Sequence, residues 1–221
     1  MGSSIKTGRR ALVVLAVAAS ALSAIAVLPS APAFADTATR TTGSPVHTLS
    51  QAIAELQSHD TTLPRAAETA DDNNGFVCAT VDTPIRSVAN GDYVTAQIDY
   101  TGDQYGMLRA GHATAVGPWE QFNLCRNDTT NTYAIRSVAN GEYVTAQIDY
   151  TGDQYGMLRA RTAAAPGPWE QFTFEPTGNG YAIRALANGE YVTAQIDYTG
   201  DQYGMLRART AAAPGPWEQF Q

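Results

Sequence analysis

Hydrophobic and polar residues follow one another in the same order three times along most of this 221-residue chain. The segment YVTAQIDYTGDQYGMLRA begins at Tyr93, Tyr143 and Tyr191, and all of its residues are identical in the three copies. A Trp-Glu-Gln-Phe segment follows each copy, at spacings of 50 and 48 residues. A repeat of about 48 residues that continues to the last residue predicts one architecture built from equivalent units.

Within each unit, alternating apolar and polar positions predict four short β-strands. In the middle copy these strands are YAIRSVA, EYVTAQI, GMLRA and PWEQFTF. Asn140-Gly141 stands between the first two strands, and Asn-Gly is a strong signal for a tight hairpin turn. Pro168 opens the fourth strand, where a proline removes no ladder hydrogen bond. We expect no helix within the repeats.

Four strands in each of three units predict an all-β fold that closes about a three-fold axis. A propeller usually has four or more blades, whereas a β-prism with three sheets around an axis is an open alternative. The domain is expected at residues 76–221, with units at about 76–125, 126–175 and 176–221.

Large aromatic residues in each unit are expected to fill the core, because Trp and Phe bury large apolar areas. These pairs are Trp119 with Phe122, Trp169 with Phe172 and Trp217 with Phe220. Ile135, Val144, Leu158 and their counterparts in the other copies are expected to join them. The alternative for the aromatic pairs is that their rings stack on sugars.

The first 35 residues read as a secretory signal peptide. A basic start, an apolar run over residues 11–28 and the small-residue sequence Ala33-Phe34-Ala35 have that layout. We therefore expect a secreted protein without stable membrane insertion after cleavage. Residues 36–75 read as a linker or lead-in, in which TLSQAIAELQS predicts a short helix at 48–58, with Thr48 and Gln51 in capping-box positions.

Without the signal peptide the chain keeps 11 basic residues, all of them arginine, against 21 acidic ones, so its formal charge is −10. A nucleic-acid-binding domain normally presents a basic face, and anionic membranes repel such a surface as well. We expect a monomer that binds neither. Cys78 and Cys125 are an even pair in an oxidising compartment and predict a disulfide.

The pattern IRSVANGEYVTAQ…GMLRAR…GPWEQF resembles the fascin-like branch of the β-trefoil proteins. It occurs at 85–122, 135–172 and 183–220. The resemblance implies a six-stranded barrel capped by three hairpins. Arg86, Arg136 and Arg184 are expected to pair with acids near the barrel end, and Glu120, Glu170 and Glu218 to hold a neighbouring strand or an arginine.

The recurring segment DYTGDQYG is the candidate ligand-binding loop. It is too polar to be buried, and it carries two tyrosines and two carboxylates. A flat ring beside acceptor oxygens suits a sugar, whose apolar face stacks while its hydroxyls donate to Asp. The alternative is that Tyr packs over the barrel end and Asp satisfies turn amides. The candidate residues are Asp99, Tyr100, Asp103, Tyr105, Asp149, Tyr150, Asp153, Tyr155, Asp197, Tyr198, Asp201 and Tyr203.

Metal binding and catalysis find little support in the residues. Two carboxylates such as Asp99 and Asp103 fall short of the six to eight oxygens that calcium takes. His112 is the only histidine of the repeats, its counterparts are Arg161 or Thr162, and no nucleophile motif such as Gly-x-Ser-x-Gly occurs. We expect no cofactor and no enzyme activity.

A secreted trefoil that binds a polysaccharide or cell-wall glycan through three loops is therefore the favoured interpretation. The resemblance also implies an alternative, the crosslinking of actin filaments, although acidic actin and an acidic chain repel each other. A structural or inhibitory trefoil that binds another extracellular protein is a further alternative.

Overall fold

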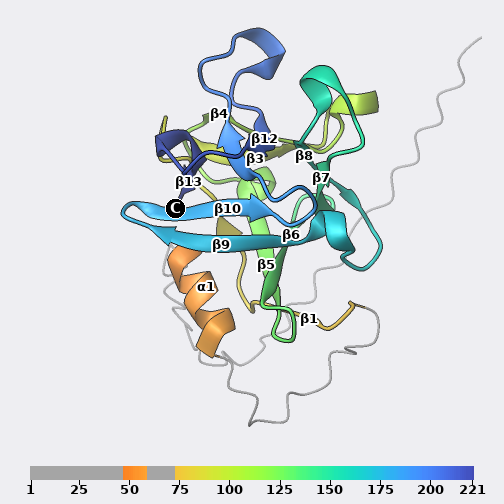
Figure 1. The fold of residues 1–221 in the computed structure, drawn as a ribbon, viewed down its shortest axis with the longest axis vertical. Coiled ribbons are helices and arrows are strands. Elements are labelled where there is room, and N and C mark those ends of the chain that lie inside the picture. The colour runs from red at the N-terminus through yellow and green to blue at the C-terminus, as the bar shows by residue number, and fades with distance from the viewer. Residues whose placement is uncertain (1–46, 59–72) are drawn as a thin grey trace, which may run out of the picture. The chain divides into compact units, whose positions relative to one another are not determined.

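The computed structural model describes residues 47–58 and 73–221, all of which belong to one compact unit. The predicted signal peptide, residues 1–35, and most of the predicted lead-in lie outside the described residues. Within the described ranges the chain is almost entirely β-structure with one α-helix (Figure 1).

Antiparallel strands form a closed barrel. β5 (Gln121–Asn127) pairs with β6 (Thr132–Ser137), and β9 (Phe172–Thr177) pairs with β10 (Gly180–Ala185). β6 also pairs with β9, and β10 with β13 (Gln219–Phe220). The first strand is broken into β1 (Phe76–Cys78) and β2 (Thr83–Pro84), both paired with β5. A bridge between Ser87 and Phe220 joins the two ends of the barrel.

Three hairpins in the described part of the chain cover one end of the barrel. They are β3 (Tyr93–Gln97) with β4 (Met107–Ala113), β7 (Tyr143–Gln147) with β8 (Met157–Thr162), and β11 (Tyr191–Ala194) with β12 (Leu206–Thr210). Each hairpin pairs with the other two, through Met107 with Arg159, Met157 with Arg207, and Met205 with Arg109. The three methionines pack together. A closed barrel capped by three hairpins is the arrangement of a β-trefoil.

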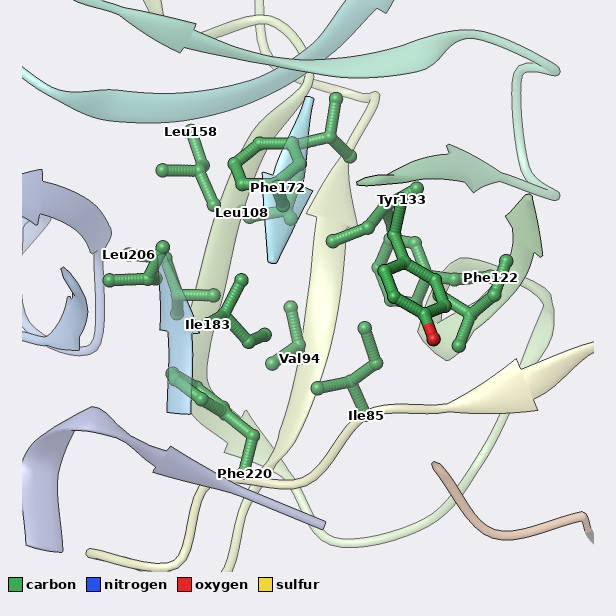
Figure 2. Close-up of a cluster of buried hydrophobic side chains, with 14 of the residues drawn as sticks. Ile85, Val94, Leu108, Phe122, Tyr133, Leu158, Phe172, Ile183, Leu206 and Phe220 are labelled. Carbon is green, nitrogen blue, oxygen red and sulfur yellow. The ribbon is translucent and has the colours of Figure 1, made fainter. Parts of the chain in front are cut away.

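The core lies inside the barrel. The phenylalanines predicted to fill it, Phe122, Phe172 and Phe220, are fully buried. The predicted aliphatic residues are buried with them, and Figure 2 shows side chains from both the barrel strands and the hairpins converging on one cluster. Val144 and Ala146 of one hairpin strand both lie in this cluster, as expected for residues two apart, since side chains of successive residues point to opposite faces of a sheet.

The tryptophans, in contrast, are not in the core, so their predicted burial is wrong. Pro-Trp-Glu forms a short 3-10 turn before the last strand of each unit: η2 (Pro118–Glu120), η4 (Pro168–Glu170) and η6 (Pro216–Glu218). The glutamate closes each turn by accepting a hydrogen bond from the amide of the preceding glycine, as Gly117 N donates to Glu120 Oε2 at 2.8 Å. The strand begins only after this turn, so the indole points outward while Phe takes the core position.

The Asn-Gly segments do not form two-residue hairpin turns. β6 ends at Ser137 and β7 begins at Tyr143, with Gly141 at a φ of 71°. The Asn140 amide instead donates to Ala160 O at 2.9 Å, and its Oδ1 accepts from Glu142 N. The wider turn is favoured because the Asn side chain ties it to another strand.

The helix α1 (Leu49–Ser58) is part of the same core. Leu49, Ala52, Ile53 and Leu56 are buried in the cluster that the barrel residues form. Thr48 N donates to Gln51 Oε1 at 2.8 Å and Gln51 N to Thr48 Oγ1 at 3.3 Å, which is a capping box. α1 lies at the end of the barrel away from the hairpin loops (Figure 1).

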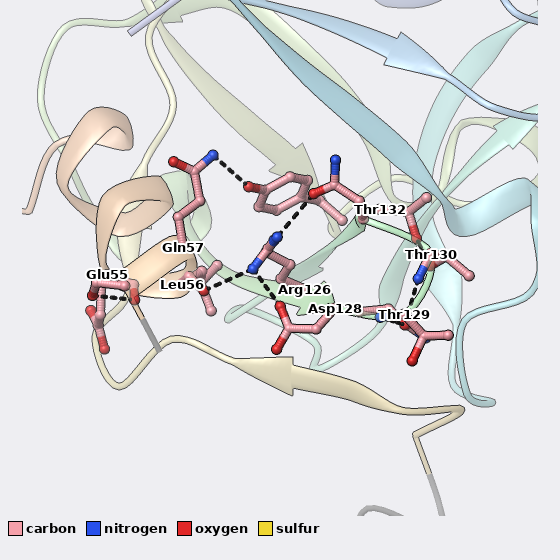
Figure 3. A network of polar contacts seen from close by, with 12 residues as sticks. Glu55, Leu56, Gln57, Arg126, Asp128, Thr129, Thr130 and Thr132 are labelled. Atoms are coloured by element: carbon pink, nitrogen blue, oxygen red, sulfur yellow. Dashed lines mark hydrogen bonds and ion pairs between the residues drawn. The ribbon is translucent and has the colours of Figure 1, made fainter. Parts of the chain in front are cut away.

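Polar contacts and a disulfide hold the barrel around α1. Gln57 Nε2 donates to Tyr133 OH at 3.1 Å, and Arg126 Nη1 donates to Leu56 O at 3.3 Å and to Asp128 (Figure 3). The predicted disulfide is confirmed: Cys78 and Cys125 are opposite each other on β1 and β5 and are joined.

Candidate functional site

The DYTGDQYG segments form three hairpin loops, here called loop 1 (99–106), loop 2 (149–156) and loop 3 (197–204). Each contains a short 3-10 turn: η1 (Gly102–Gln104), η3 (Gly152–Gln154) and η5 (Gly200–Gln202). The six predicted carboxylates, two in each loop, are all exposed. The six predicted tyrosines are half-buried. The loops therefore present exposed carboxylates beside rings that are partly packed.

Buried arginines hold the loops in place. Arg159 Nε donates to Tyr105 O and its Nη2 to Gly102 O, both at 2.8 Å. Arg207 makes the same contacts with loop 2, and Arg109 Nη2 donates to Asp201 O of loop 3. Each loop is thus anchored by an arginine from a different copy of the repeat. The sequence analysis assigned no role to these arginines, although a charged residue that recurs in the apolar segment GMLRA was a signal for one.

The charged side chains of the anchoring arginines are buried. Arg109, Arg159 and Arg207 are only 7%, 3% and 2% exposed. Burial lowers the pKa of Arg159 and of Arg207, and the nearby Arg161 and Arg209 lower it further. The charge of Asp103 acts on Arg159 in the opposite direction. Asp103 and Asp153 therefore lie near the buried positive charges of Arg159 and Arg207, whose pKa values their own charges raise.

A glycine at the end of each loop allows the hairpins to approach closely. Gly106, Gly156 and Gly204 have φ of 73°, and a Cβ at any of them would lie closer than 3.0 Å to a carbonyl of the neighbouring hairpin. Ala160 N donates to Gly106 O at 2.7 Å at this contact. Only glycine fits, because it lacks the Cβ that would collide there and tolerates positive φ.

The second tyrosine of loops 1 and 2 has an equivalent partner in each loop. Tyr105 OH accepts a hydrogen bond from Asn140 at 3.3 Å, and Tyr155 OH accepts one from Asn188 at 3.4 Å. Tyr100 packs against the three methionines of the capping hairpins, which is the alternative role considered for these tyrosines. In loop 3 the ring of Tyr203 lies against His112, with ring centroids 5.6 Å apart.

The arginines expected to pair with acids mostly do something else. Nε of Arg136 donates to Gly141 O of its own hairpin at 2.7 Å, and the guanidinium lies over the Tyr143 ring at 5.6 Å. Arg86 and Arg184 repeat this arrangement, and Arg184 also reaches Glu175 at 4.0 Å. The tyrosine that begins the next strand lies opposite each arginine in the β-ladder and offers its ring face there.

A second set of exposed groups consists of the tryptophans that were expected in the core. Trp119, Trp169 and Trp217 are 37%, 41% and 40% exposed. Glu120, Glu170 and Glu218, which close the tryptophan turns, do hold a neighbouring strand as expected, through hydrogen bonds from Thr95, Thr145 and Thr193. The described residues contain no group of three or more potential metal ligands, and no helix long and apolar enough to cross a membrane.

Comparison with known proteins reveals similarity of fold. No protein-family model and no curated sequence matches the chain. The BEL beta-trefoil in its apo crystal form 3 is 16% identical with a TM-score of 0.50, over 64% of this chain and 92% of that one. A mosquitocidal holotoxin is 14% identical with a TM-score of 0.52, over 63% and 16%. The Polyporus squamosus lectin, bound to a human-type influenza-binding epitope, is 12% identical with a TM-score of 0.48, over 62% and 46%.

This chain has a β-trefoil fold. At these identities the similarity shows the fold alone, and the chain spans less than half the length of the holotoxin and of the lectin. The resemblance to the fascin-like branch rests on the sequence pattern.

Proposed function

We propose that this chain is a secreted, non-catalytic module that binds a polysaccharide or cell-wall glycan through loops 1, 2 and 3. The observation that carries the proposal is the chemistry of the loop surface, where exposed carboxylates stand beside half-buried tyrosines in all three copies. Carboxylates accept hydrogen bonds from sugar hydroxyls, and aromatic rings stack on the apolar face of a sugar.

The anchoring of the loops supports the same proposal. Binding is weakened when a loop must be ordered first, and a preorganised loop avoids that cost. The hydrogen bonds from the buried Arg159 and Arg207 fix the backbone of loops 1 and 2 before any ligand arrives. Three equivalent weak sites on one domain can raise the apparent affinity for a repeating polymer by about 10²–10⁴ when the geometry permits.

A charge-matched pair of triple variants tests the proposal. Asp103→Asn, Asp153→Asn and Asp201→Asn together change only exposed carboxylates in the loops. We expect this variant to lose retention on columns of insoluble cellulose, chitin or bacterial cell wall that retain the natural protein, with an unchanged melting temperature. The control, Asp82→Asn, Asp128→Asn and Glu175→Gln, removes the same formal charge elsewhere and is expected to be retained. Equal retention of both variants would reject the loops as the binding site.

The fascin-like resemblance implies a competing function, the crosslinking of actin filaments. The formal charge of −10 expected after signal cleavage opposes the approach of an acidic filament. Cosedimentation with actin filaments at physiological salt distinguishes the two functions, since we expect the protein to stay in the supernatant. Pelleting with the filaments would favour the alternative.

A further inference from the structure

Among the described residues, the exposed large apolar side chains lie in or next to the tryptophan turns. They are Trp119, Val138, Trp169, Leu186 and Trp217. Backbone hydrogen bonds bring the aliphatic residues to the tryptophan turns: Val138 N donates to Gln121 O at 3.0 Å, and Leu186 N to Gln171 O at 2.9 Å. Val88, which is half-buried, is joined in the same way to Gln219. We call these places, Trp119 with Val138, Trp169 with Leu186 and Trp217 with Val88, the Trp patches.

The fold does not need an indole at these positions. The turn is closed by its glutamate, which is buried in η4 and η6. Thr145 and Thr162 both donate to Glu170 Oε1, and Thr193 donates to Glu218 Oε1. The core position of each segment belongs to the phenylalanine that follows. The tryptophan therefore exposes apolar surface on a turn that its neighbours already maintain, so the fold does not account for its presence in all three copies.

The size of a Trp patch limits what can cover it. A tryptophan side chain offers about 150–250 Å², so an indole that is about 40% exposed leaves on the order of 100 Å² free. A stable protein interface takes about 800 Å² from each partner. Separate small flat apolar faces fit a ligand that itself consists of repeated small units with one apolar face each.

We infer that the Trp patches are a second set of glycan-binding sites, in which the apolar face of a pyranose ring stacks on each indole. This inference rests on the proposed function and extends it, because the patches belong to the 3-10 turns before the last strand of each unit and not to loops 1, 2 and 3. The exposed Arg136 and Arg184 take no part in this inference, because their guanidinium groups are held over the rings of Tyr143 and Tyr191.

The chain contains only these three tryptophans, so their fluorescence reports on the Trp patches and on nothing else. We expect a soluble β-glucan, xylan, galactan or chito-oligosaccharide that binds the protein to shift the emission to shorter wavelength and to protect the indoles from iodide quenching. Loops 1, 2 and 3 contain no tryptophan, so binding confined to them leaves emission and quenching unchanged, and that result would overturn the inference while the proposed function stands.

Two triple variants provide the matched comparison. Replacing all three tryptophans by Leu keeps apolar volume but removes the flat ring, whereas replacing them by Phe keeps a ring. Aromatic stacking contributes about 0.5–1.5 kcal/mol per site, which corresponds to about 2- to 10-fold in affinity. By calorimetry with the same soluble probe, we expect the Leu variant to bind about 2- to 10-fold more weakly than the Phe variant. Equal affinities would contradict stacking.

The remaining outcomes are also decisive. If none of the four probes binds the natural protein in either assay, the proposed function and this inference fail together. An emission spectrum that shifts with protein concentration, without any glycan, would assign the Trp patches to contacts between copies of this chain and overturn the inference. The fluorescence and quenching measurements use the natural protein, so they hold even if a triple variant fails to fold.

Discussion

Replacing Arg207 by Met removes the anchor of loop 2 while keeping a long unbranched side chain. In the natural protein Nε of Arg207 donates to Tyr155 O at 2.9 Å, and Nη2 donates to Gly152 O and to Tyr155 O, both at 2.8 Å. Methionine fills much of the same volume but donates no hydrogen bond. The carbonyl groups of Gly152 and Tyr155 then lose their hydrogen-bond donor. Arg207 itself is only 2% exposed.

The expected loss of stability follows from these contacts. Hydrogen bonds from a charged donor contribute about 1.5–3 kcal/mol each, and a buried acceptor left without a partner costs about 1–3 kcal/mol. The variant also escapes the cost of burying a guanidinium, which amounts to several kcal/mol per ion and which also lowers the pKa of Arg207. We expect a net loss of about 2–4 kcal/mol from the free energy of unfolding.

Urea unfolding measures this difference. With an m-value of about 2 kcal/mol/M, the midpoint should fall by about 1–2 M. Arg209→Met is the matched control, because Arg209 lies two residues further along and is exposed; it should change the free energy by less than about 0.5 kcal/mol. Amide exchange should accelerate in loop 2 in the Arg207 variant alone. If both variants unfold at the same urea concentration, the arginine does not anchor the loop.

Three further predictions concern the hairpin contact, the helix and the tyrosines. Gly156→Ala places a Cβ closer than 3.0 Å to a carbonyl of the neighbouring hairpin, whereas a Cβ in Gly152→Ala, also at positive φ, meets nothing within 4 Å. In thermal unfolding Gly152→Ala should lose about 1 kcal/mol of stability, and Gly156→Ala should lose more. An equal loss in both variants would contradict the steric argument. Ile53→Asp should lower the free energy of unfolding by at least about 3 kcal/mol because Ile53 is buried. Asp at the exposed position 54 should be tolerated. Equal urea midpoints for the two variants would show that α1 does not pack on the barrel. Burial raises the pKa of Tyr143, so the stability that its neutral phenol contributes is complete below about pH 10 and is lost as the pH rises through the higher folded-state pKa. In urea titrations Tyr143→Phe should therefore lose less stability above about pH 10 than the natural protein does. The same loss in both proteins would contradict the buried placement of this phenol.

The tryptophans show where pattern reading from the sequence reached its limit. A large aromatic that recurs once per unit has the spacing of a core residue, and in Phe122 and Phe172 that expectation was correct. Trp119 failed because the segment before the strand is a 3-10 turn closed by a glutamate side chain. A change from strand to turn over three residues reverses the direction of a side chain, and periodicity does not record such a change.

The repetition in the sequence by itself determined that the fold is all-β, where its hairpins lie and which aliphatic residues alternate into the core, because these properties depend on residues close together in the chain. Only the tertiary structure decided which groups meet around the loops and which remain exposed. Arg159 and Tyr105 are 54 residues apart in sequence, and their hydrogen bond exists only because the hairpins pair with one another. A contact between distant copies leaves no local pattern in the sequence, so only the tertiary structure identifies the anchoring arginines. The outward direction of the indoles likewise required the geometry of the 3-10 turns.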